Sequence, residues 1–238
     1  MRLVNYAIVL CGIAACVLAG ADANQQMKTE LMDRVDHLVY ATPDLAAGVE
    51  RVEKLLGVKA VAGGQHPGGG TRNALIRLGD ESYLEIIGPD PDQPKPPRPR
   101  RFNIDELKLP QLVTWAAKGN DLETIVENAK KNGIGLGQVQ AGSRKRPDGV
   151  LLAWRLTVSP SLTADGLVPF FIDWGKTPHP AAALPKGCTL VALRAEHPNP
   201  KRVQAELAAL GLNVVVNPGH GPSLVATIRT PKGEVELR

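Results

Sequence analysis

The chain of 238 residues is 43% hydrophobic and 22% charged, an ordinary globular balance that excludes wholesale disorder and collagen-like or coiled-coil chains. Aromatic residues make up only 4%, which is too few for a platform on which single-stranded nucleic acid could stack. The formal net charge of +4 is mild, and much of the excess lies in one short basic run, so we expect no nucleic-acid partner.

The first residues have the layout of an export signal. Arg2 and the amino terminus supply positive charge, residues 6–18 are almost entirely apolar, and residues 21–23 have the small-x-small form of a cleavage site. About thirteen apolar residues are too few to span a bilayer of roughly 30 Å at about 1.5 Å per residue. We therefore predict a signal peptide at residues 1–23 and a secreted or periplasmic protein with no membrane span after cleavage. An uncleaved anchor is one alternative. Lipid anchoring to the cell envelope at Cys16, whose surroundings resemble a lipoprotein box, is another.

Cleavage would remove Cys11 and Cys16 and leave Cys188 as the only cysteine. A lone cysteine forms no internal disulfide, so the domain must be stable through its hydrophobic core. Cys188 precedes the apolar run 189–193, and we predict that it is a small buried side chain rather than a nucleophile.

Three segments of the chain repeat one order of predicted elements: a strand, a helix and three further strands. The first segment begins with the β-rich run 35–41, and Asp44 is placed to cap a helix that Gly57 ends. The remaining predicted elements of this segment are a short strand at 59–61, a glycine-rich loop at 63–70 and strands at 73–78 and 82–87.

The same order returns twice. In the second segment Asn120 or Asp121 caps the predicted helix and Gly133 closes it. Strands are predicted at 112–116, 138–140, 150–156 and 170–174 in the second segment and at 190–193, 213–216, 224–228 and 235–237 in the third. The predicted units cover about 35–88, 111–175 and 188–238 of one domain, residues 30–238. The connector 89–110 contains seven prolines, and we expect an exposed, semi-rigid loop there.

Repeated units of this kind bury their helices by pairing with one another. We therefore predict an α+β fold in which β-α-β-β-β units form curled, open, mixed sheets. The concave face of such a sheet is a natural site for a small-molecule ligand.

Several motifs make the chain recognisable. They are the run 36–40 (DHLVY), the loop 64–68 followed by 70–73, the run 83–86 (YLEI), and 170–174 (FFIDW) with His179 just after it. On these motifs the sequence resembles the vicinal oxygen chelate (glyoxalase/bleomycin resistance/dioxygenase) superfamily, and within it the glyoxalase-like domain proteins. The superfamily hosts lyases, isomerases, dioxygenases and binding proteins, so the resemblance is more specific for fold than for reaction.

The resemblance implies a divalent metal ion inside the curled sheet, acting as a Lewis acid on substrate oxygens. By motif match, His37 and Glu85 stand at the ligand positions of the first unit. The second unit has Thr114 and Ile172 at these positions, and neither is a good ligand. In the third unit Glu236 matches Glu85 and is a further candidate ligand. The metal is therefore expected to rest on two secure protein ligands.

Other candidate site residues surround this pair. His66, in the glycine-rich loop, is a candidate catalytic residue, and the loop has no Gly-Lys-Ser/Thr sequence, so we expect no nucleotide cofactor. The predicted substrate-binding residues are Thr71, Arg72, Asn73, Trp174 and His179. The basic run 98–101 of the connector suits an anionic lipid or an acidic substrate, or it is a solvated loop.

The leading hypothesis is an exported glyoxalase-like enzyme of lyase or isomerase type that acts on a small oxygenated metabolite. His37 and Glu85 would hold a metal or act as a base–acid pair, and His66 with Asn73 would orient the substrate. The alternative is a metal-free protein that binds or sequesters a small molecule on the same fold. A third hypothesis is an interaction module of the cell envelope that uses the connector.

Overall fold

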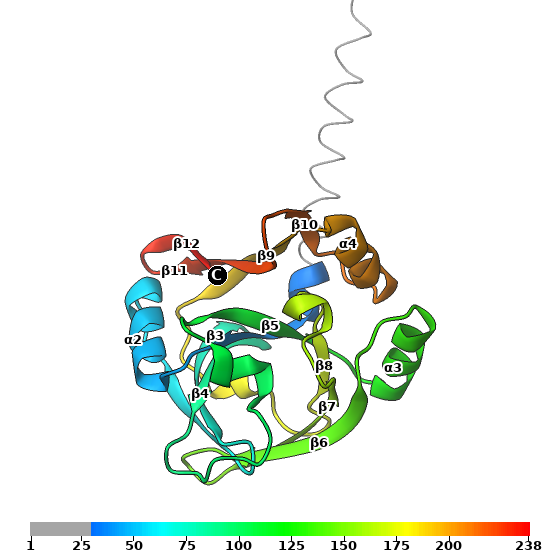
Figure 1. Ribbon diagram of the computed structural model, residues 1–238. Helices are drawn as coiled ribbons and strands as arrows, with labels where there is room; N and C mark the ends of the chain where they lie inside the picture. The colour runs from blue at the N-terminus through cyan, green and yellow to red at the C-terminus, as the bar shows by residue number, and fades with distance from the viewer. Residues whose placement is uncertain (1–29) are drawn as a thin grey trace, which may run out of the picture.

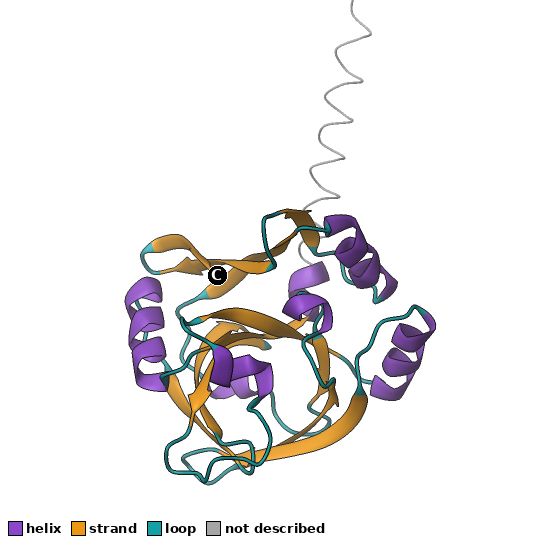
Figure 2. Ribbon diagram, viewed as in Figure 1, coloured by secondary structure: helices purple, strands orange, loops and turns teal. Residues whose placement is uncertain are grey.

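The computed structural model describes residues 30–238, so the predicted signal peptide and the alternative anchor at Cys16 lie outside the described residues. Eight strands form one sheet in the order β2-β3-β4-β1-β5-β8-β7-β6. Figures 1 and 2 show this sheet curled into a ring, with helices α2 and α3 on its outside and a smaller second sheet across one side. Within residues 30–238, no helix combines the length and apolar character needed to cross a membrane. The predicted α+β fold with curled mixed sheets is confirmed, although the eight-stranded sheet is nearly closed rather than open.

The first unit supplies half of the ring. It consists of β1 (Val35–Ala41), α2 (Leu45–Leu56), β2 (Val61–His66), β3 (Thr71–Gly79) and β4 (Ser82–Pro89). Helix α2 begins at Asp44, whose carboxylate accepts a hydrogen bond from the backbone N–H of Ala47, and ends at Gly57, whose φ of 72° is left-handed. Both predicted caps are therefore confirmed.

Strand β2 differs from its prediction. The sequence predicted a short strand at 59–61 and a loop at 63–70, but β2 continues to His66 and only residues 67–70 form the turn. Pairing with β3 satisfies the backbone groups of the glycines, with a bulge between Ala62 and Gly64. His66 consequently sits at the end of a strand that forms the sheet edge.

The second unit supplies the other half of the ring. It consists of β5 (Gln111–Lys118), α3 (Leu122–Lys131), β6 (Gln138–Lys145), β7 (Leu151–Val158), the 3-10 helix η2 (Thr163–Gly166) and β8 (Phe170–Asp173). Antiparallel pairing of β5 with β1 joins the two units. The connector between them is not wholly an exposed loop: it holds the 3-10 helix η1 (Arg101–Glu106), and Ile104 is buried against Val39 and Ala41 on the concave face.

The third unit has the predicted elements but a different pairing. It consists of β9 (Thr189–His197), α4 (Pro200–Ala209), β10 (Val215–Pro218), β11 (Ser223–Thr230) and β12 (Gly233–Leu237), and a 3-10 helix η3 (Pro180–Ala183) precedes it. In the first unit the first strand pairs with the last, whereas here the strand order is β10-β9-β11-β12. The first and last strands are therefore separated, and Glu236 on β12 does not take the position that Glu85 has on β4. Cys188, before β9, is buried as predicted.

The large core lies outside the ring. Alternate residues of β1 and β4, such as Leu38 and Leu84, join one cluster with residues of α2, α3 and the second sheet. His37 and Glu85 alternate with them and therefore point to the concave face. The packing of the helices and of the second sheet thus fixes which side chains enter the ring.

Two free edges, β2 and β6, meet and nearly close the ring. Arg144 of β6 is 3% exposed, and its guanidinium donates a hydrogen bond to the carbonyl oxygen of Gly63 in β2. Gly64 beside it has a φ of 141°, and a Cβ there would clash with the carbonyl oxygen of Lys145. The approach of the two edges therefore requires glycine at this position.

We expect Gly64→Ala to lower the free energy of unfolding by roughly 2 kcal/mol, because the alanine is strained at this φ and collides with β6. Urea denaturation followed by tryptophan fluorescence measures the loss. Gly135→Ala is the control, since its Cβ meets nothing within 4 Å and its φ is not left-handed. Equal stabilities of the two variants would contradict closure of the ring at this point.

Candidate functional site

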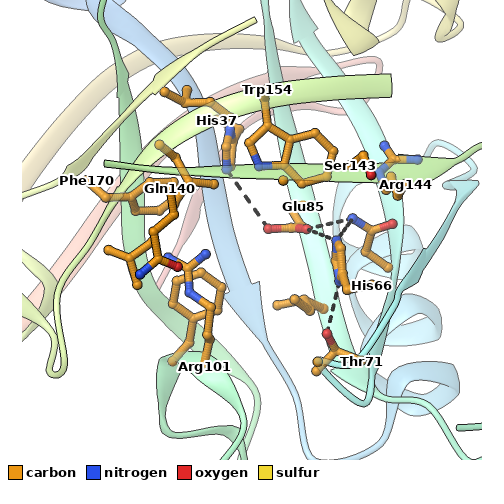
Figure 3. Close-up of a pocket in the computed structure, with 18 of the residues that line it drawn as sticks. His37, His66, Thr71, Glu85, Arg101, Gln140, Ser143, Arg144, Trp154 and Phe170 are labelled. Atoms are coloured by element: carbon orange, nitrogen blue, oxygen red, sulfur yellow. Dashed lines mark hydrogen bonds and ion pairs between the residues drawn. The ribbon is translucent and has the colours of Figure 1, made fainter. Parts of the chain in front are cut away.

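A cavity of about 400 Å³ lies inside the ring and is lined by both units. Its titratable lining residues are His37, His66, Tyr83, Glu85, Arg101 and Arg144. Figure 3 shows the imidazoles of His37 and His66 on opposite sides of the Glu85 carboxylate, with Arg101 below them. The cavity therefore brings together the three residues that the sequence predicted to be catalytic.

His37 is held rigidly on β1. Its Nδ1 lies 2.6 Å from Oδ1 of Asp36, and its Nε2 lies 4.0 Å from Oε2 of Glu85. Neighbouring residues of a regular strand face opposite sides, but a bulge between Val35 and His37 lets Asp36 reach the imidazole. The ring also stacks on Tyr83, with centroids 4.7 Å apart. One nitrogen is thus occupied by a carboxylate and the other faces the cavity.

Asp36 is buried behind His37 as a shared acceptor. Its Oδ2 accepts a hydrogen bond from the indole N–H of Trp174 at 2.9 Å and lies 3.3 Å from Nε2 of His179. Burial alone would raise the pKa of Asp36, but hydrogen bonds from His179 and His37 together with their charges lower the pKa to about 2. Asp36 is therefore ionised throughout the physiological range.

Glu85 is the carboxylate at the centre of the cavity. Its Oε1 accepts a hydrogen bond from the Asn73 amide at 2.6 Å and lies 3.7 Å from Nε2 of His66. Burial would raise the pKa of Glu85, but attraction to His66 and His37, the Asn73 bond and the charge of Arg144 lower it. The carboxylate is consequently ionised although only 7% of the residue is exposed.

His66 supports Glu85 from the sheet edge. Its Nδ1 lies 2.9 Å from the Thr71 hydroxyl, and its Nε2 lies 3.4 Å from the Asn73 amide nitrogen. Burial lowers the pKa of His66, and the charges of Arg144 and Arg101 oppose the attraction of Glu85. His66 is therefore neutral at pH 7, and we expect it to act as a hydrogen-bonding group.

Two arginines add positive charge to the cavity. Arg144 enters from β6, and Arg101 enters from η1, where its guanidinium lies 4.7 Å from the Phe102 ring centroid and 5.4 Å from that of Phe170. No ion pair joins Arg101 to a carboxylate among residues 30–238. A cavity with two guanidinium groups around one lining carboxylate suits a ligand that is itself an anion.

The family described as Glyoxalase-like domain matches residues 35–211 of the sequence. The chain belongs to the glyoxalase-like domain family. This confirms the resemblance to the glyoxalase-like domain proteins that the motifs predicted. No curated protein matches the sequence.

This glyoxalase-like domain is similar to several solved structures at low sequence identity. A hypothetical protein from Staphylococcus aureus is 14% identical with a TM-score of 0.59, covering 85% of this chain and 83% of that chain. Methylmalonyl-CoA epimerase from Mycobacterium tuberculosis is 17% identical with a TM-score of 0.40, covering 60% and 88%. A Streptomyces coelicolor methylmalonyl-CoA epimerase in complex with 2-nitronate-propionyl-CoA is 21% identical with a TM-score of 0.39, covering 58% and 95%.

Three of the predicted site residues are not brought to the cavity of the glyoxalase-like domain. Arg72 alternates with Thr71 and Asn73 on β3, so it faces outward and forms ion pairs with Asp90 and Asp92. His179 lies behind the cavity, against Asp36 and the ring of Tyr83. Glu236 lies in the second sheet, where its carboxylate pairs with Arg194 and Arg238.

The donor set of the cavity is incomplete for the divalent metal that the glyoxalase-like family implies. Among residues 30–238, no group of three or more His, Cys, Asp or Glu side chains is placed to hold a metal ion. Ile172 lines the cavity where the second unit would supply a ligand. Arg144 lines the same cavity and brings a positive charge to it. The residues present therefore do not fit a metal held by three or four protein ligands.

The sequence missed four features of the site. Asp36 shows no signal beyond its place in the run 36–40, because alternation along a strand would turn it away from His37. Arg144 carries no local signal, since only closure of the ring brings it to the cavity. Arg101 is one of the arginines of the basic run 98–101. Only the fold of the connector shows that Arg101, unlike Arg98 and Arg100, lines the cavity around Glu85. Gln140, from β6, lines the cavity for the same reason as Arg144.

We expect Asp36→Asn to remove part of the acid sensitivity of folding. Asp36 has a pKa of about 2 when folded against an ordinary 3.8, so its contribution is fully present above pH 4 and is lost as the pH falls toward 2. The variant should lose about 2 kcal/mol of stability at pH 7 relative to the wild type, and the difference should shrink below pH 3. Urea denaturation between pH 2 and pH 7 measures this. Asp148→Asn is the control, because that exposed carboxylate contacts only Arg146 and the backbone N–H of Val150 across a turn. A stability difference independent of pH would contradict the assignment.

Proposed function

We propose that the protein is an enzyme of isomerase or lyase type that moves a proton on a small, oxygenated, anionic metabolite. The observation that carries the proposal is the alignment of Asp36, His37 and Glu85, with His37 and Glu85 lining one cavity and Asp36 buried behind the imidazole. A carboxylate that orients an imidazole, whose other nitrogen faces the substrate space, is the arrangement of a general base.

His37 would take the proton at Nε2. Because ionised Asp36 accepts a hydrogen bond from Nδ1–H of His37, the free electron pair of the imidazole lies on Nε2 and faces the cavity. When Nε2 accepts a proton, Asp36 and Glu85 both stabilise the resulting imidazolium, and Glu85 at 4.0 Å can accept the proton in turn. His37 and Glu85 therefore act as a base–acid pair, and His66 with Asn73 holds Glu85 in place.

Hydrogen-bond donors that line the cavity would stabilise the negative charge that forms on the substrate. Removal of a proton next to a carbonyl group leaves an oxyanion, which hydrogen-bond donors placed in a largely enclosed site stabilise strongly. Arg101 and Gln140 both line the cavity and can donate a hydrogen bond to such an oxygen. The rings of Trp154, Phe170 and Trp174 surround the same space and limit the access of water.

The metal-assisted reaction predicted from the sequence stays an alternative within this proposal. His37 and Glu85 are the two ligands that the sequence offers for it, and within residues 30–238 no third His, Cys, Asp or Glu is placed to complete the set. A metal-free protein that binds or sequesters a small molecule is the second candidate, because the second unit supplies Ile172 and Thr114 rather than ligands.

Proton exchange with solvent tests the proposal directly. Ligands are found by thermal shift with a panel of 2-oxo acids, β-keto acids and hydroxyketones, because a ligand of the folded state raises the melting temperature. Each ligand is then incubated with the protein in D₂O, and NMR measures loss of the C–H signal next to the carbonyl. We expect exchange with the wild type, and about a hundredfold slower exchange with His37→Gln and with Glu85→Gln.

The controls separate an enzyme from a binding protein and from a metal enzyme. Arg72→Gln faces outward on β3 and should leave exchange unchanged. A ligand that stabilises every variant without any exchange would support the binding protein instead. Elemental analysis of the wild type and of His37→Ala, with exchange remeasured after chelator treatment, tests the metal: a bound metal lost in His37→Ala would support the metal-assisted alternative.

We also propose that the protein is exported, on the strength of the charged, apolar and small-residue regions in the first 23 residues. Expression of the full chain in a bacterial host, followed by fractionation and intact mass measurement, tests this. We expect a mature chain that begins at Asn24, in the periplasm or the medium. A mass that corresponds to the uncleaved chain would contradict the signal peptide, and a lipid-modified chain beginning at Cys16 would support the lipoprotein alternative.

A further inference from the structure

A second cavity, of about 640 Å³, adjoins the first beneath the connector. The two share lining residues at their junction, namely Arg101, Phe102, Gln140, Val158 and Phe170. The walls of the second cavity come from the connector, from β6 and β7, and from the segment 159–163 that follows β7. A ligand that occupies the first cavity can therefore continue into the second without leaving the protein surface.

The second cavity is basic, and we call it the arginine cavity. Arg98, Arg100 and Arg101 line it, and none of its lining residues among those the structure describes is Asp or Glu. Arg100 is neutralised by Asp105 and is bound to the carbonyl oxygen of Gly70. In the described part of the chain no ion pair links Arg98 or Arg101 to a carboxylate. Neither charge is therefore matched by an ion pair within residues 30–238, and the carboxylate that attracts Arg101 is Glu85 of the first cavity.

The backbone around the arginine cavity adopts unusual conformations. Across residues 30–238, the non-glycine residues with positive φ are Phe102, Asn103, Ala164 and Asp165. Phe102 and Asn103 line the cavity from the connector, and the other two directly follow Thr163, which lines it from the opposite wall. Left-handed conformations are unfavourable at Phe102 and Ala164, are better tolerated by Asn and Asp, and concentrate at ligand-binding sites. The strained positions thus mark the same place as the unpaired charges.

We propose that the arginine cavity binds the anionic end of the substrate, a phosphate or carboxylate group, while the reacting end lies against His37 and Glu85. This assignment of the substrate class rests on the proposed function. Guanidinium groups bind phosphate and carboxylate oxygens through paired, charge-assisted hydrogen bonds. The hydroxyl groups of Ser159 and Ser161 line the same cavity and add further donors. The substrate is accordingly an elongated oxygenated acid or phosphate ester rather than a compact neutral carbonyl compound.

Anion binding by the purified protein tests this proposal. Isothermal titration calorimetry is carried out with inorganic phosphate, pyrophosphate and succinate at low salt. We expect saturable binding of at least one probe, weakened about tenfold in Arg98→Gln and only partly restored in Arg98→Lys, which keeps the charge but lacks the paired donors. Phosphate or pyrophosphate preferred over succinate would identify a phosphate ester, and the reverse preference would identify a carboxylic acid.

The controls separate this proposal from the proposed function. Lys201→Gln removes the same charge from the exposed start of α4, away from both cavities, and should bind as the wild type does. Arg98 lines only the arginine cavity, so an effect of Arg98→Gln supports the anion site whatever Glu85→Gln does to proton exchange. No saturable binding, equal binding by wild type and Arg98→Gln, or binding only to phosphatidylglycerol vesicles would overturn the proposal.

Discussion

The site depends on the approach of the two free edges of the eight-stranded sheet. An open sheet would leave the backbone edges of β2 and β6 in water and the Glu85 carboxylate exposed on a concave face. Gly64 allows the edges to meet, and the buried guanidinium of Arg144 bridges them at the carbonyl oxygen of Gly63. The same guanidinium lowers the pKa of Glu85. One contact therefore closes the ring, encloses the cavity and helps keep its central carboxylate ionised.

Burial of several charges in a small space is unfavourable unless each has a partner. Asp36 has three partners and Glu85 has Asn73 with two imidazoles, so both acids are stabilised inside the protein. The cations are less balanced, because Arg101 contacts aromatic rings rather than a carboxylate. A bound anion would supply the missing charge. This imbalance links the cavity around Glu85 to the arginine cavity and explains why one extended acidic ligand suits both.

The repeats have diverged in ways that concentrate the chemistry in the first unit. The first unit places His37 and Glu85 on its paired first and last strands, whereas the second places Ile172 and Phe170 at the cavity and contributes Gln140 and Arg144 from an outer strand. The third unit has the same elements, but β9 pairs with β10 and β11 instead of the last strand. It packs on the outside of the ring, where it contributes buried residues to the core, and it contributes none to the lining of the cavity around Glu85.

The sequence alone determined the order of most elements, the caps at Asp44 and Gly57, the glyoxalase-like family and the choice of His37, His66 and Glu85 as candidates, because local patterns and motifs carry that information. It could not place Asp36, since a bulge overrides strand alternation, or the pairing of β12, since element order does not fix strand order. Arg144 and Arg101 enter the site only through contacts between segments far apart in the chain. The tertiary structure therefore decided the charge of the cavity and its extension into a second one, because both arise where β2, β6 and the connector meet.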